Sequence, residues 1–344
     1  MAIDIIGTGR VVPPRRVSND ELAARVDTSD EWIKSHTGIC NRFIAGEDTA
    51  CSDLAVEAAK NAMALAAGCN GDDPAERDRA AAEIAKTIDM IVLATATADY
   101  FGTPSTACIV QESIGAHKAA AMDITAGCTG FVYGLETAAG LLGISAQRKR
   151  ALVIGSEILT RVTNWEDRRT CVLFGDGAGA VVLEKNDNEK TGLLQSLLYA
   201  DGSGKESLVM RRGGTRNPFK EGEVIKDNGI YIEMNGQEVY NFAVKAITDT
   251  ILALMENGNF SIEDIAYIVP HQANARIVEA ARRRLRIPKE KIYMNIEEYA
   301  NTSAASIPIA LDEMNRGGRL RGGDMILTVG FGGGLTYGGN VIIW

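Results

Sequence analysis

Three residues have side chains suited to nucleophilic and hydrogen-bonding chemistry: Cys128, His271 and Asn301. Cys128 lies in Ala126-Gly-Cys-Thr-Gly130, a turn of small residues before an apolar stretch. A thiol at a helix N-terminus meets the positive end of the helix dipole and unpaired N–H groups, which favour the thiolate. Small neighbours also leave room for an acyl chain. We therefore predict an acyl-carrying nucleophile; the alternative is a buried packing cysteine.

His271 and Asn301 each follow an apolar segment. His271 opens a polar His-Gln-Ala-Asn run and is one of three histidines, while Asn301 opens Asn-Thr-Ser-Ala-Ala-Ser306. Either could be structural, as a helix-start histidine bonded to backbone or as an N-cap asparagine. All three residues at strand–helix junctions of a duplicated fold predict one shared site.

The glycine runs and the other cysteines indicate neither a dinucleotide site nor a metal site. Gly330–Gly334 and Gly175–Gly179 lead into strands rather than helices, so they fail the context test for a dinucleotide fingerprint. The first run is better suited to close backbone approach and to an N–H that stabilises an oxyanion. The six cysteines contain no Cys-x-x-Cys pair and no metal-ligand spacing, so we expect free thiols in a reducing compartment.

Composition narrows the class of protein. The chain has 344 residues, which allows a large core in one or two domains. A net charge of −9 argues against generic nucleic-acid binding. No apolar run is long enough to cross a bilayer, and the first residues show no export signal, so we expect a cytoplasmic enzyme with no membrane contact.

Apolar β-branched runs alternate with Ala-rich stretches, which predicts an α/β protein with largely parallel sheets. Ser18-x-x-Glu21 predicts a capping box. The expected strands are Ile3–Ile6, Met90–Ala94, Ala120–Ile124, Ala151–Ile154, Ala180–Leu183, Ala266–Val269, Met325–Val329 and Tyr337–Ile343. The expected helices are Ser18–Val26, Asp53–Ala67, Thr106–Ser113, Cys128–Leu142, Gln237–Asn257, Ala273–Leu285 and Thr302–Asn315.

The two halves of the chain echo each other. In each half a strand is followed by a helix, then by a short strand and a turn into a small-residue helix: Met122–Cys128 in one half, Met294–Asn301 in the other. We expect two fused copies of one domain, 1–190 and 191–344, with Cys128 and Asn301 at equivalent helix starts. Ligand sites of open α/β sheets lie beyond strand C-termini, so the three residues could converge between the halves.

Two segments fall outside this repeat. The segment 70–87 is charged and contains Pro74, which indicates a surface insertion with a short helix. The segment 201–228 is rich in Gly and charge and is expected to be a long loop or flap.

Motifs along nearly the whole chain resemble the 3-oxoacyl-[acyl-carrier-protein] synthase III family of the thiolase superfamily. They are Thr28-Ser-Asp-Glu-Trp-Ile, Thr37-Gly-Ile, Ala126-Gly-Cys-Thr-Gly-Phe, Phe174-Gly-Asp-Gly-Ala-Gly, Val269-Pro-His-Gln-Ala-Asn, Asn301-Thr-Ser-Ala-Ala-Ser and Phe331-Gly-Gly-Gly. The resemblance implies a thiolase-like five-layered αβαβα fold, a homodimer and an acyltransferase of fatty acid biosynthesis. An acyl group would pass from acyl-CoA to Cys128. Malonyl-acyl-carrier protein would then decarboxylate and attack the acyl thioester, with no metal or redox cofactor.

The same resemblance assigns roles to individual residues. Cys128, His271 and Asn301 would be catalytic, and the N–H groups of Cys128 and Gly333 would form the oxyanion hole. The remaining assignments are CoA binding by Trp32, Arg168 and Asn274, an acyl pocket with Thr103 (contributed across the dimer) and Phe331, and carrier-protein docking by Arg276 and Arg283.

Two positions depart from the family pattern. His36 replaces a customary arginine, which puts CoA binding in doubt because a neutral histidine lacks a permanently charged bidentate donor. Thr103 replaces the phenylalanine of many acetyl-specific relatives, which predicts tolerance for longer primers. The helix with Arg276 and Arg283 also carries Arg282 and Arg284. The alternative to carrier-protein docking is that these arginines form a basic helix C-terminus that complements the helix dipole.

Other functions stay open at this point. One is a specialised ketosynthase or acyltransferase of secondary metabolism; another is a non-catalytic acyl-CoA-binding protein, against which the intact triad argues. A hydroxymethylglutaryl-CoA synthase is disfavoured because no matching acidic motif precedes Cys128.

Overall fold

Two β-sheets form the frame of this computed structural model, which describes residues 2–71, 73–188, 190–222 and 228–344. The first sheet has the order β1 (Ala2–Val11), β7 (Asp176–Asn186), β6 (Arg150–Ile158), β4 (Met90–Ala94) and β5 (Ala120–Ile124). The second has the order β11 (Ile265–Pro270), β12 (Met325–Gly332), β13 (Thr336–Ile343) and β8 (Gly192–Ala200).

The two sheets share one topology. Read from β8, the second sheet runs β8-β13-β12-β11, as the first runs β1-β7-β6-β4. The place of β5 is held by a single bridge between Ile268 and Ile292, so the short strand expected near Met294 is wrong. A single helical turn, α9 (Ile296–Tyr299), lies there instead. This order supports the duplication; the boundary between 190 and 191 stays a prediction.

The sheets are mixed, so the expectation of largely parallel sheets is wrong. β4 pairs in parallel with β5 and β6, and β11 with β12. β1, β7, β13 and β8 instead make antiparallel pairs. The apolar runs of β7 and β13 were indistinguishable from parallel strands because both strands are largely buried. β8 was not predicted, and its pattern is only partly buried.

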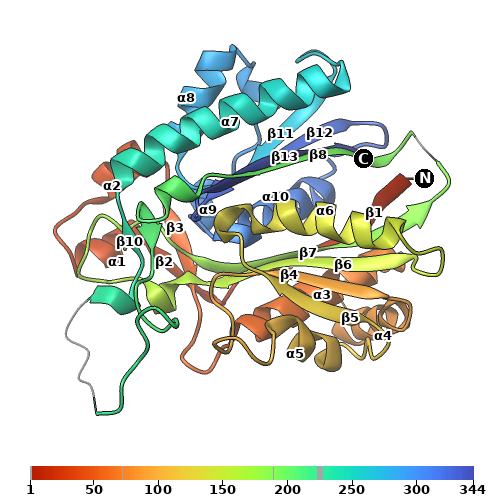
Figure 1. Ribbon diagram of the computed structural model, residues 1–344, viewed down its shortest axis with the longest axis horizontal. Helices are drawn as coiled ribbons and strands as arrows, with labels where there is room; N and C mark the ends of the chain where they lie inside the picture. Colours follow the sequence, from red (N-terminus) through yellow and green to blue (C-terminus); the bar gives the residue numbers. More distant parts are fainter. Residues whose placement is uncertain (1, 72, 189, 223–227) are drawn as a thin grey trace.

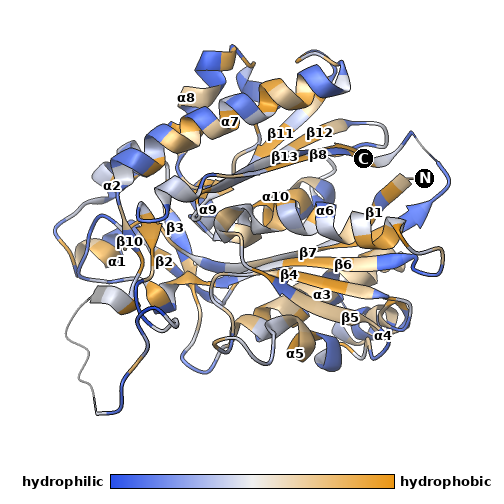
Figure 2. Ribbon diagram, in the orientation of Figure 1, coloured by the Kyte–Doolittle hydropathy of each residue, from blue (hydrophilic) through white to orange (hydrophobic). Residues whose placement is uncertain are grey.

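Helices cover both outer faces and fill the space between the sheets, which makes five layers (Figure 1). α3 (Cys51–Ala66), α4 (Pro74–Ala85) and α5 (Thr106–Ser113) lie outside the first sheet, and α7 (Gly236–Gly258) and α8 (Ala275–Leu285) outside the second. α6 (Gly130–Gly143) and α10 (Ser306–Arg316) lie between the sheets. Apolar residues are frequent along the strands, as Figure 2 shows, and many of them belong to the buried clusters between the layers.

Small residues determine how closely the layers approach. A Cβ on Gly9 of β1 would lie 2.3 Å from the Ala62 nitrogen of α3. The α3 face that packs there carries Ala55, Ala58, Ala59 and Ala62, all fully buried. The Ala-rich pattern of this helix therefore reflects close packing on the sheet as well as helix propensity.

A smaller group of elements packs at one end of the sheets. It contains β2 (Arg15–Ser18), β3 (Asn41–Ile44), α1 (Asn19–Ala23) and α2 (Asp30–Thr37). The capping box of Ser18 and Glu21 is confirmed at the start of α1. β2, β3 and α2 were not predicted; β2 and β3 have only four residues each.

The two segments outside the repeat have some structure. α4 supplies the helix of the 70–87 insertion, in which residue 72 lies outside the described residues. The 201–228 segment contains β9 (Leu208–Val209), which pairs with β10 (Glu233–Met234); residues 223–227 of it lie outside the described residues. No described helix is both long and apolar enough to cross a membrane.

Candidate active site

Cys128 lies in a 3₁₀ turn, Gly127–Thr129, that leads into α6. The end of β12 presses against this turn: a Cβ on Gly332 would lie 2.7 Å from the Cys128 nitrogen, and one on Gly127 3.0 Å from the Gly333 nitrogen. Only glycine permits this approach. The predicted oxyanion-hole pair, Cys128 and Gly333, is thus carried on two closely apposed backbones.

The resting Cys128 side chain is a thiol. Burial raises its pKa to about 12, the Ser303 hydroxyl lowers it, and the Glu157 carboxyl raises it further. These effects outweigh any stabilisation of the thiolate by the start of α6. The influence of the helix start, which favours the thiolate, is therefore outweighed in the resting site.

His271 directly follows β11 and is 1% exposed. Its Nδ1 lies 2.7 Å from the Ser306 hydroxyl, which accepts a hydrogen bond from the Gln272 N–H at 3.3 Å. We assign the tautomer in which the Ser306 hydroxyl donates to Nδ1 and the ring proton resides on Nε2. Burial lowers the His271 pKa to about 3, so the imidazole is neutral. It is a hydrogen-bond donor through Nε2–H.

Asn301 is held in place by hydrogen bonds of its backbone and of its side-chain amide oxygen. Its N–H donates to the Leu173 oxygen at 2.9 Å, and its Oδ1 accepts from the Ser303 N–H at 2.8 Å. The Nδ2 group is thereby left to donate into the cavity that Asn301 lines. The preceding Ala300 has φ +56°, an uncommon conformation for alanine that costs about 1–3 kcal/mol. Such local strain is typical of functional sites.

Cys128, His271 and Asn301 line one cavity of about 250 Å³, which we call the entrance cavity. It also brings in residues that the sequence assigned to CoA and carrier-protein binding. Its walls include Trp32, His36, Cys128, Phe174, Leu208, Tyr240, His271, Asn274, Arg276, Asn301 and Phe331. Residues from both halves of the chain therefore meet here, as predicted.

Cys128 also faces a second, apolar cavity of about 120 Å³, which we call the acyl cavity. It shares Cys128, Phe174 and Leu208 with the entrance cavity. Its other walls are Ala96, Gly127, Leu159, Val209, Met210, Ile232, Ser303 and Gly333. The Cys128 sulfur thus lies between the entrance cavity, whose wall includes polar side chains, and the apolar acyl cavity.

Neither predicted acyl-pocket residue lines the acyl cavity of its own chain. Phe331 lines the entrance cavity, with its ring 5.1 Å from that of His271 in an edge-on contact. Thr103 is exposed, in a loop beside Tyr100 and Phe101. An arrangement in which Thr103 acts across a dimer stays a prediction.

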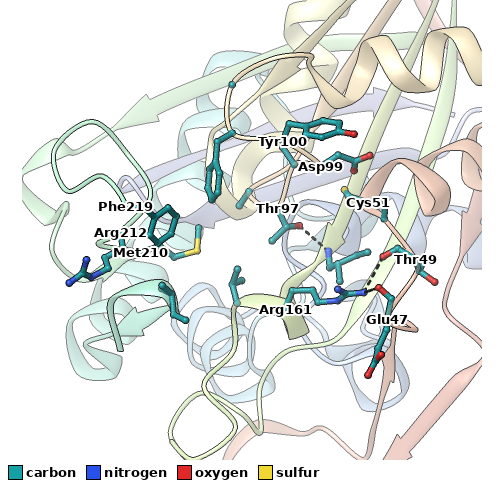
Figure 3. Close-up of a pocket in the computed structure, with 18 of the residues that line it drawn as sticks. Glu47, Thr49, Cys51, Thr97, Asp99, Tyr100, Arg161, Met210, Arg212 and Phe219 are labelled. Atoms are coloured by element: carbon teal, nitrogen blue, oxygen red, sulfur yellow. Dashed lines mark hydrogen bonds between the residues drawn. The ribbon is translucent and has the colours of Figure 1, made fainter. Parts of the chain in front are cut away.

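A third cavity of about 650 Å³ continues from the acyl cavity, with which it shares Ala96 and Met210 (Figure 3). Thr97, Asp99 and Arg161 contribute polar groups to it, and Phe219 an aromatic ring. Arg161 Nη2 donates to the Gly46 oxygen at 2.6 Å, which fixes the loop before α3.

Trp32 lies on α2 among cationic and aromatic neighbours. The Arg168 guanidinium carbon is 4.9 Å from the centre of its ring, and the His36 ring stacks on it at 4.3 Å with an interplanar angle of 17°. The His36 Nδ1 lies 2.7 Å from the Trp32 oxygen. His36 therefore extends the aromatic surface of Trp32 where the family arginine would carry charge.

Asn274 and the two predicted docking arginines belong to α8 and its N-cap. The Asn274 amide donates to the His36 oxygen at 3.1 Å and accepts from the Arg276 N–H at 2.8 Å, so it ties α2 to α8. Arg276 lines the entrance cavity. Arg283 is 74% exposed and pairs with Glu279 at 2.6 Å.

The site includes residues that sequence reasoning missed. Ser303 and Ser306 orient the triad, and both lie within the quoted Asn301–Ser306 motif, where their spacing from Asn301 was an available signal. Leu208 and Glu157 had no such signal. Among the described residues, no group of three or more His, Cys, Asp or Glu side chains is arranged to hold a metal ion.

Comparisons with known proteins bear on the whole chain. Residues 122–202 match the family profile 3-oxoacyl-[acyl-carrier-protein (ACP)] synthase III, and residues 255–344 match that of its C-terminal part. A β-ketoacyl-[acyl-carrier-protein] synthase III of Caldanaerobacter subterraneus subsp. tengcongensis is 46% identical over 344 residues, covering 100% of this chain and 98% of the relative. One from Clostridium perfringens is 47% identical over 338 residues, with 98% of each covered.

Solved structures agree. The 3-oxoacyl-[acyl-carrier-protein] synthase III of Aquifex aeolicus superposes with a TM-score of 0.85 at 40% identity, covering 100% of both chains. The priming β-ketosynthase of the R1128 polyketide pathway has a TM-score of 0.86 at 31% identity, covering 99% of this chain and 96% of that one.

Proposed function

Because this chain belongs to the 3-oxoacyl-[acyl-carrier-protein] synthase III family, we propose that it condenses an acyl-CoA primer with malonyl-acyl-carrier protein. The product is a 3-oxoacyl-carrier protein, the first condensation product of fatty acid biosynthesis. One observation carries the proposal: the entrance cavity joins a thiol, a neutral imidazole and a primary amide to the Trp32 surface.

In the first half-reaction, Cys128 takes the acyl group. Its sulfur attacks the thioester carbonyl of the primer, the CoA thiolate leaves, and the acyl chain occupies the acyl cavity. The apolar side chains of Leu159, Met210 and Ile232 suit a hydrocarbon. The N–H groups of Cys128 and Gly333 stabilise the oxyanion, and loss of one such donor typically costs about 10²–10³ in rate.

In the second half-reaction, His271 and Asn301 act on the malonyl thioester. His271 Nε2–H and Asn301 Nδ2 donate hydrogen bonds to its carbonyl oxygen while the carboxylate departs as CO₂. The enolate carbon attacks the acyl-Cys128 carbonyl, and the Cys128 sulfur is the leaving group. A neutral imidazole suits this role because it donates one hydrogen bond through Nε2–H while the ring itself carries no charge. Loss of CO₂ drives the step, so the reaction needs no metal or redox cofactor.

CoA and the carrier protein share the outer part of the entrance. Trp32 and Arg168 would hold the adenine, and Asn274 would act by tying α2 to α8. Arg276 and Arg283 would meet acidic groups of the carrier protein. His36 supplies stacking surface in place of a charged donor, so phosphate contacts of CoA are fewer than in relatives with arginine.

The assembly and the place of action are also proposals. Tyr100 and Phe101 are 57% and 84% exposed, and this exposed apolar surface supports burial against a second copy in a homodimer. In that dimer the Thr103 loop would lie near the acyl cavity of the partner. The free thiols suit the cytoplasm.

A loading experiment tests the proposed function. The protein and its Cys128→Ala variant are incubated with a panel of acyl-CoAs and analysed by intact mass, and malonyl-carrier protein is then added. We expect an acyl adduct on the native protein alone, followed by a 3-oxoacyl product. An adduct that survives the substitution would reject the nucleophile, and a loaded protein without product would indicate an acyltransferase. Preference for an unusual primer would favour a priming ketosynthase of secondary metabolism, to which the 31% identical polyketide relative points.

A further inference from the structure

Arg169, in the loop between β6 and β7, is a cation of the entrance cavity wall that the steps above do not use. It also borders a separate polar cavity of about 770 Å³, which we call the side cavity. The two cavities share Arg169, Met234 and Gly236. The Arg169 side chain is 78% exposed, so it stands at the boundary between the two cavities and is open to a ligand that enters from solvent.

The charges around the two cavities direct an anion to the entrance side of Arg169. Among the described residues, the entrance cavity is lined by two permanently charged side chains, Arg169 and Arg276, and by no Asp or Glu. The described wall of the side cavity instead has one cation, Arg169, against Asp167, Glu206 and Glu233. Glu206 and Glu233 share one partner, Arg211, so the acids still outnumber the arginines there. A negatively charged ligand is therefore favoured in the entrance cavity and disfavoured in the side cavity.

Asp167 fixes Arg169 and leaves one edge of its guanidinium group free. Arg169 donates to the two Asp167 carboxylate oxygens from Nε at 2.9 Å and from Nη2 at 3.1 Å, and its backbone N–H donates to Oδ1 at 3.0 Å. Within the described chain, Arg169 Nη1 has no hydrogen-bond partner. Because a guanidinium group has five N–H donors in a planar fork, the edge formed by Nη1 and Nη2 can donate two parallel bonds to a phosphate.

The neighbours of Arg169 explain why a phosphate would need this cation. His36 lines the same cavity where the family pattern has an arginine, and its ring lies against Trp32. Arg168 is already engaged, since its Nη1 donates to the Asp27 oxygen at 2.7 Å and its guanidinium group lies over Trp32. Arg169 is the adjacent arginine with a free donor edge.

We propose that Arg169 binds the phosphates of the acyl-CoA donor and restores a contact that is lost at position 36. The inference rests on the proposed function. CoA carries a pyrophosphate and a 3′-phosphate, whereas the prosthetic arm of a carrier protein carries a single phosphodiester. The more highly charged CoA therefore depends more on Arg169, while Arg276 and Arg283 serve the carrier protein. Arg169 thus selects the donor for the first half-reaction.

The test compares two donors with the same acyl group, acyl-CoA and acyl-pantetheine, on the full-length native protein and on Arg169→Gln. Loading of Cys128 is followed by quenched-flow intact mass. With acyl-CoA, Arg169→Gln should raise the Michaelis constant about 10- to 100-fold, the scale of hydrogen bonds to a charged group, and leave the saturating loading rate within about twofold of native. With acyl-pantetheine, which has no phosphate, kcat/KM of the two proteins should agree within about twofold. An equal loss with both donors would overturn the proposal, because Arg169 would then act only on the shape of the site.

Two further variants examine the charge and the fork of Arg169. Arg169→Lys keeps the charge but loses the second parallel bond, so its Michaelis constant for acyl-CoA should lie between those of the native protein and Arg169→Gln. His36→Arg should restore most of the acyl-CoA loading that Arg169→Gln loses, and absence of rescue would overturn the link to position 36. Arg79→Gln is the control, because Arg79 is an exposed arginine of α4 that lines none of the cavities named above.

Malonyl-carrier protein separates CoA from the carrier arm as the ligand of Arg169. After Arg169→Gln has been loaded at a high acyl-CoA concentration, the Michaelis constant for malonyl-carrier protein should stay within about twofold of native. A rise equal to that for acyl-CoA would overturn the assignment to CoA. Failure of the native protein to load at all would instead overturn the proposed function.

Discussion

Removal of the Ser306 hydroxyl should separate the two half-reactions. Ser306→Ala deletes the group 2.7 Å from His271 Nδ1 and leaves that nitrogen buried without a partner. It also removes the acceptor of the Gln272 N–H at 3.3 Å. An unsatisfied buried polar atom costs about 1–3 kcal/mol. If the ring turns to recover a bond, its Nε2–H no longer points at the substrate.

We expect the free-energy cost of the misplaced imidazole to appear in the barrier of malonyl decarboxylation. At about 1.4 kcal/mol for each factor of ten, 1–3 kcal/mol corresponds to a loss of about 5- to 150-fold in malonyl decarboxylation. In the proposed mechanism acyl loading on Cys128 does not use His271, so its rate should stay within about threefold of native, an effect of under 1 kcal/mol. Release of CO₂ from malonyl-carrier protein and intact-mass loading, on the same preparations, give the two rates.

A matched control is available four residues earlier. The Thr302 hydroxyl is buried and lacks a hydrogen-bond partner, so Thr302→Val removes a hydroxyl of similar burial without orphaning any group. We expect it to leave both rates close to native. The reasoning about the His271 tautomer would be refuted if Ser306→Ala slowed loading as much as decarboxylation, or if it slowed neither.

Three other substitutions or conditions have defined outcomes. Thr103→Phe should lower kcat/KM for long primers at least tenfold more than for acetyl-CoA, about 1.4 kcal/mol, and equal effects in a primer panel would argue against a pocket role. Arg283→Glu should raise the Michaelis constant for malonyl-carrier protein severalfold, more at low salt, and spare acyl-CoA loading; a constant that does not change would remove Arg283 from the docking surface. Because the folded His271 pKa is about 3 and the ordinary value is 6.5, the unfolded chain binds the extra proton between these values. The free energy of unfolding should therefore fall as pH drops through that window. His271 should contribute up to about 1.4 kcal/mol per pH unit to this fall. Urea titrations at pH 6.5 and 4.5 should show a smaller fall for the His271→Asn variant than for the native protein.

Much of the frame could be predicted because its elements are long and strongly patterned. The strands Met90–Ala94 and Ala120–Ile124 and the helix Thr106–Ser113 have the predicted bounds. Strand direction could not be predicted, because a strand such as β7 is covered on both faces whether its neighbours are parallel or antiparallel. β9 and β10 have two residues each, too few for any periodicity.

The triad could be anticipated for a different reason. Cys128 and Asn301 lie at helix starts that the internal repeat makes equivalent, and His271 directly follows a strand, so the topology brings the three near one another. The protonation states could not be anticipated, since they depend on burial. The start of α6 suggested a thiolate, while enclosure by Ser303, Glu157 and the glycines of β12 keeps the proton on sulfur.

The common wall of the entrance and acyl cavities has a consequence for the order of events. Cys128, Phe174 and Leu208 border both spaces, so an acyl chain stored on one side leaves the other side vacant. Both thioester donors must use that same vacancy, and the first carrier has to depart before the second arrives. We therefore expect free CoA and the malonyl-carrier protein to exclude each other from the entrance cavity, which predicts double-displacement kinetics.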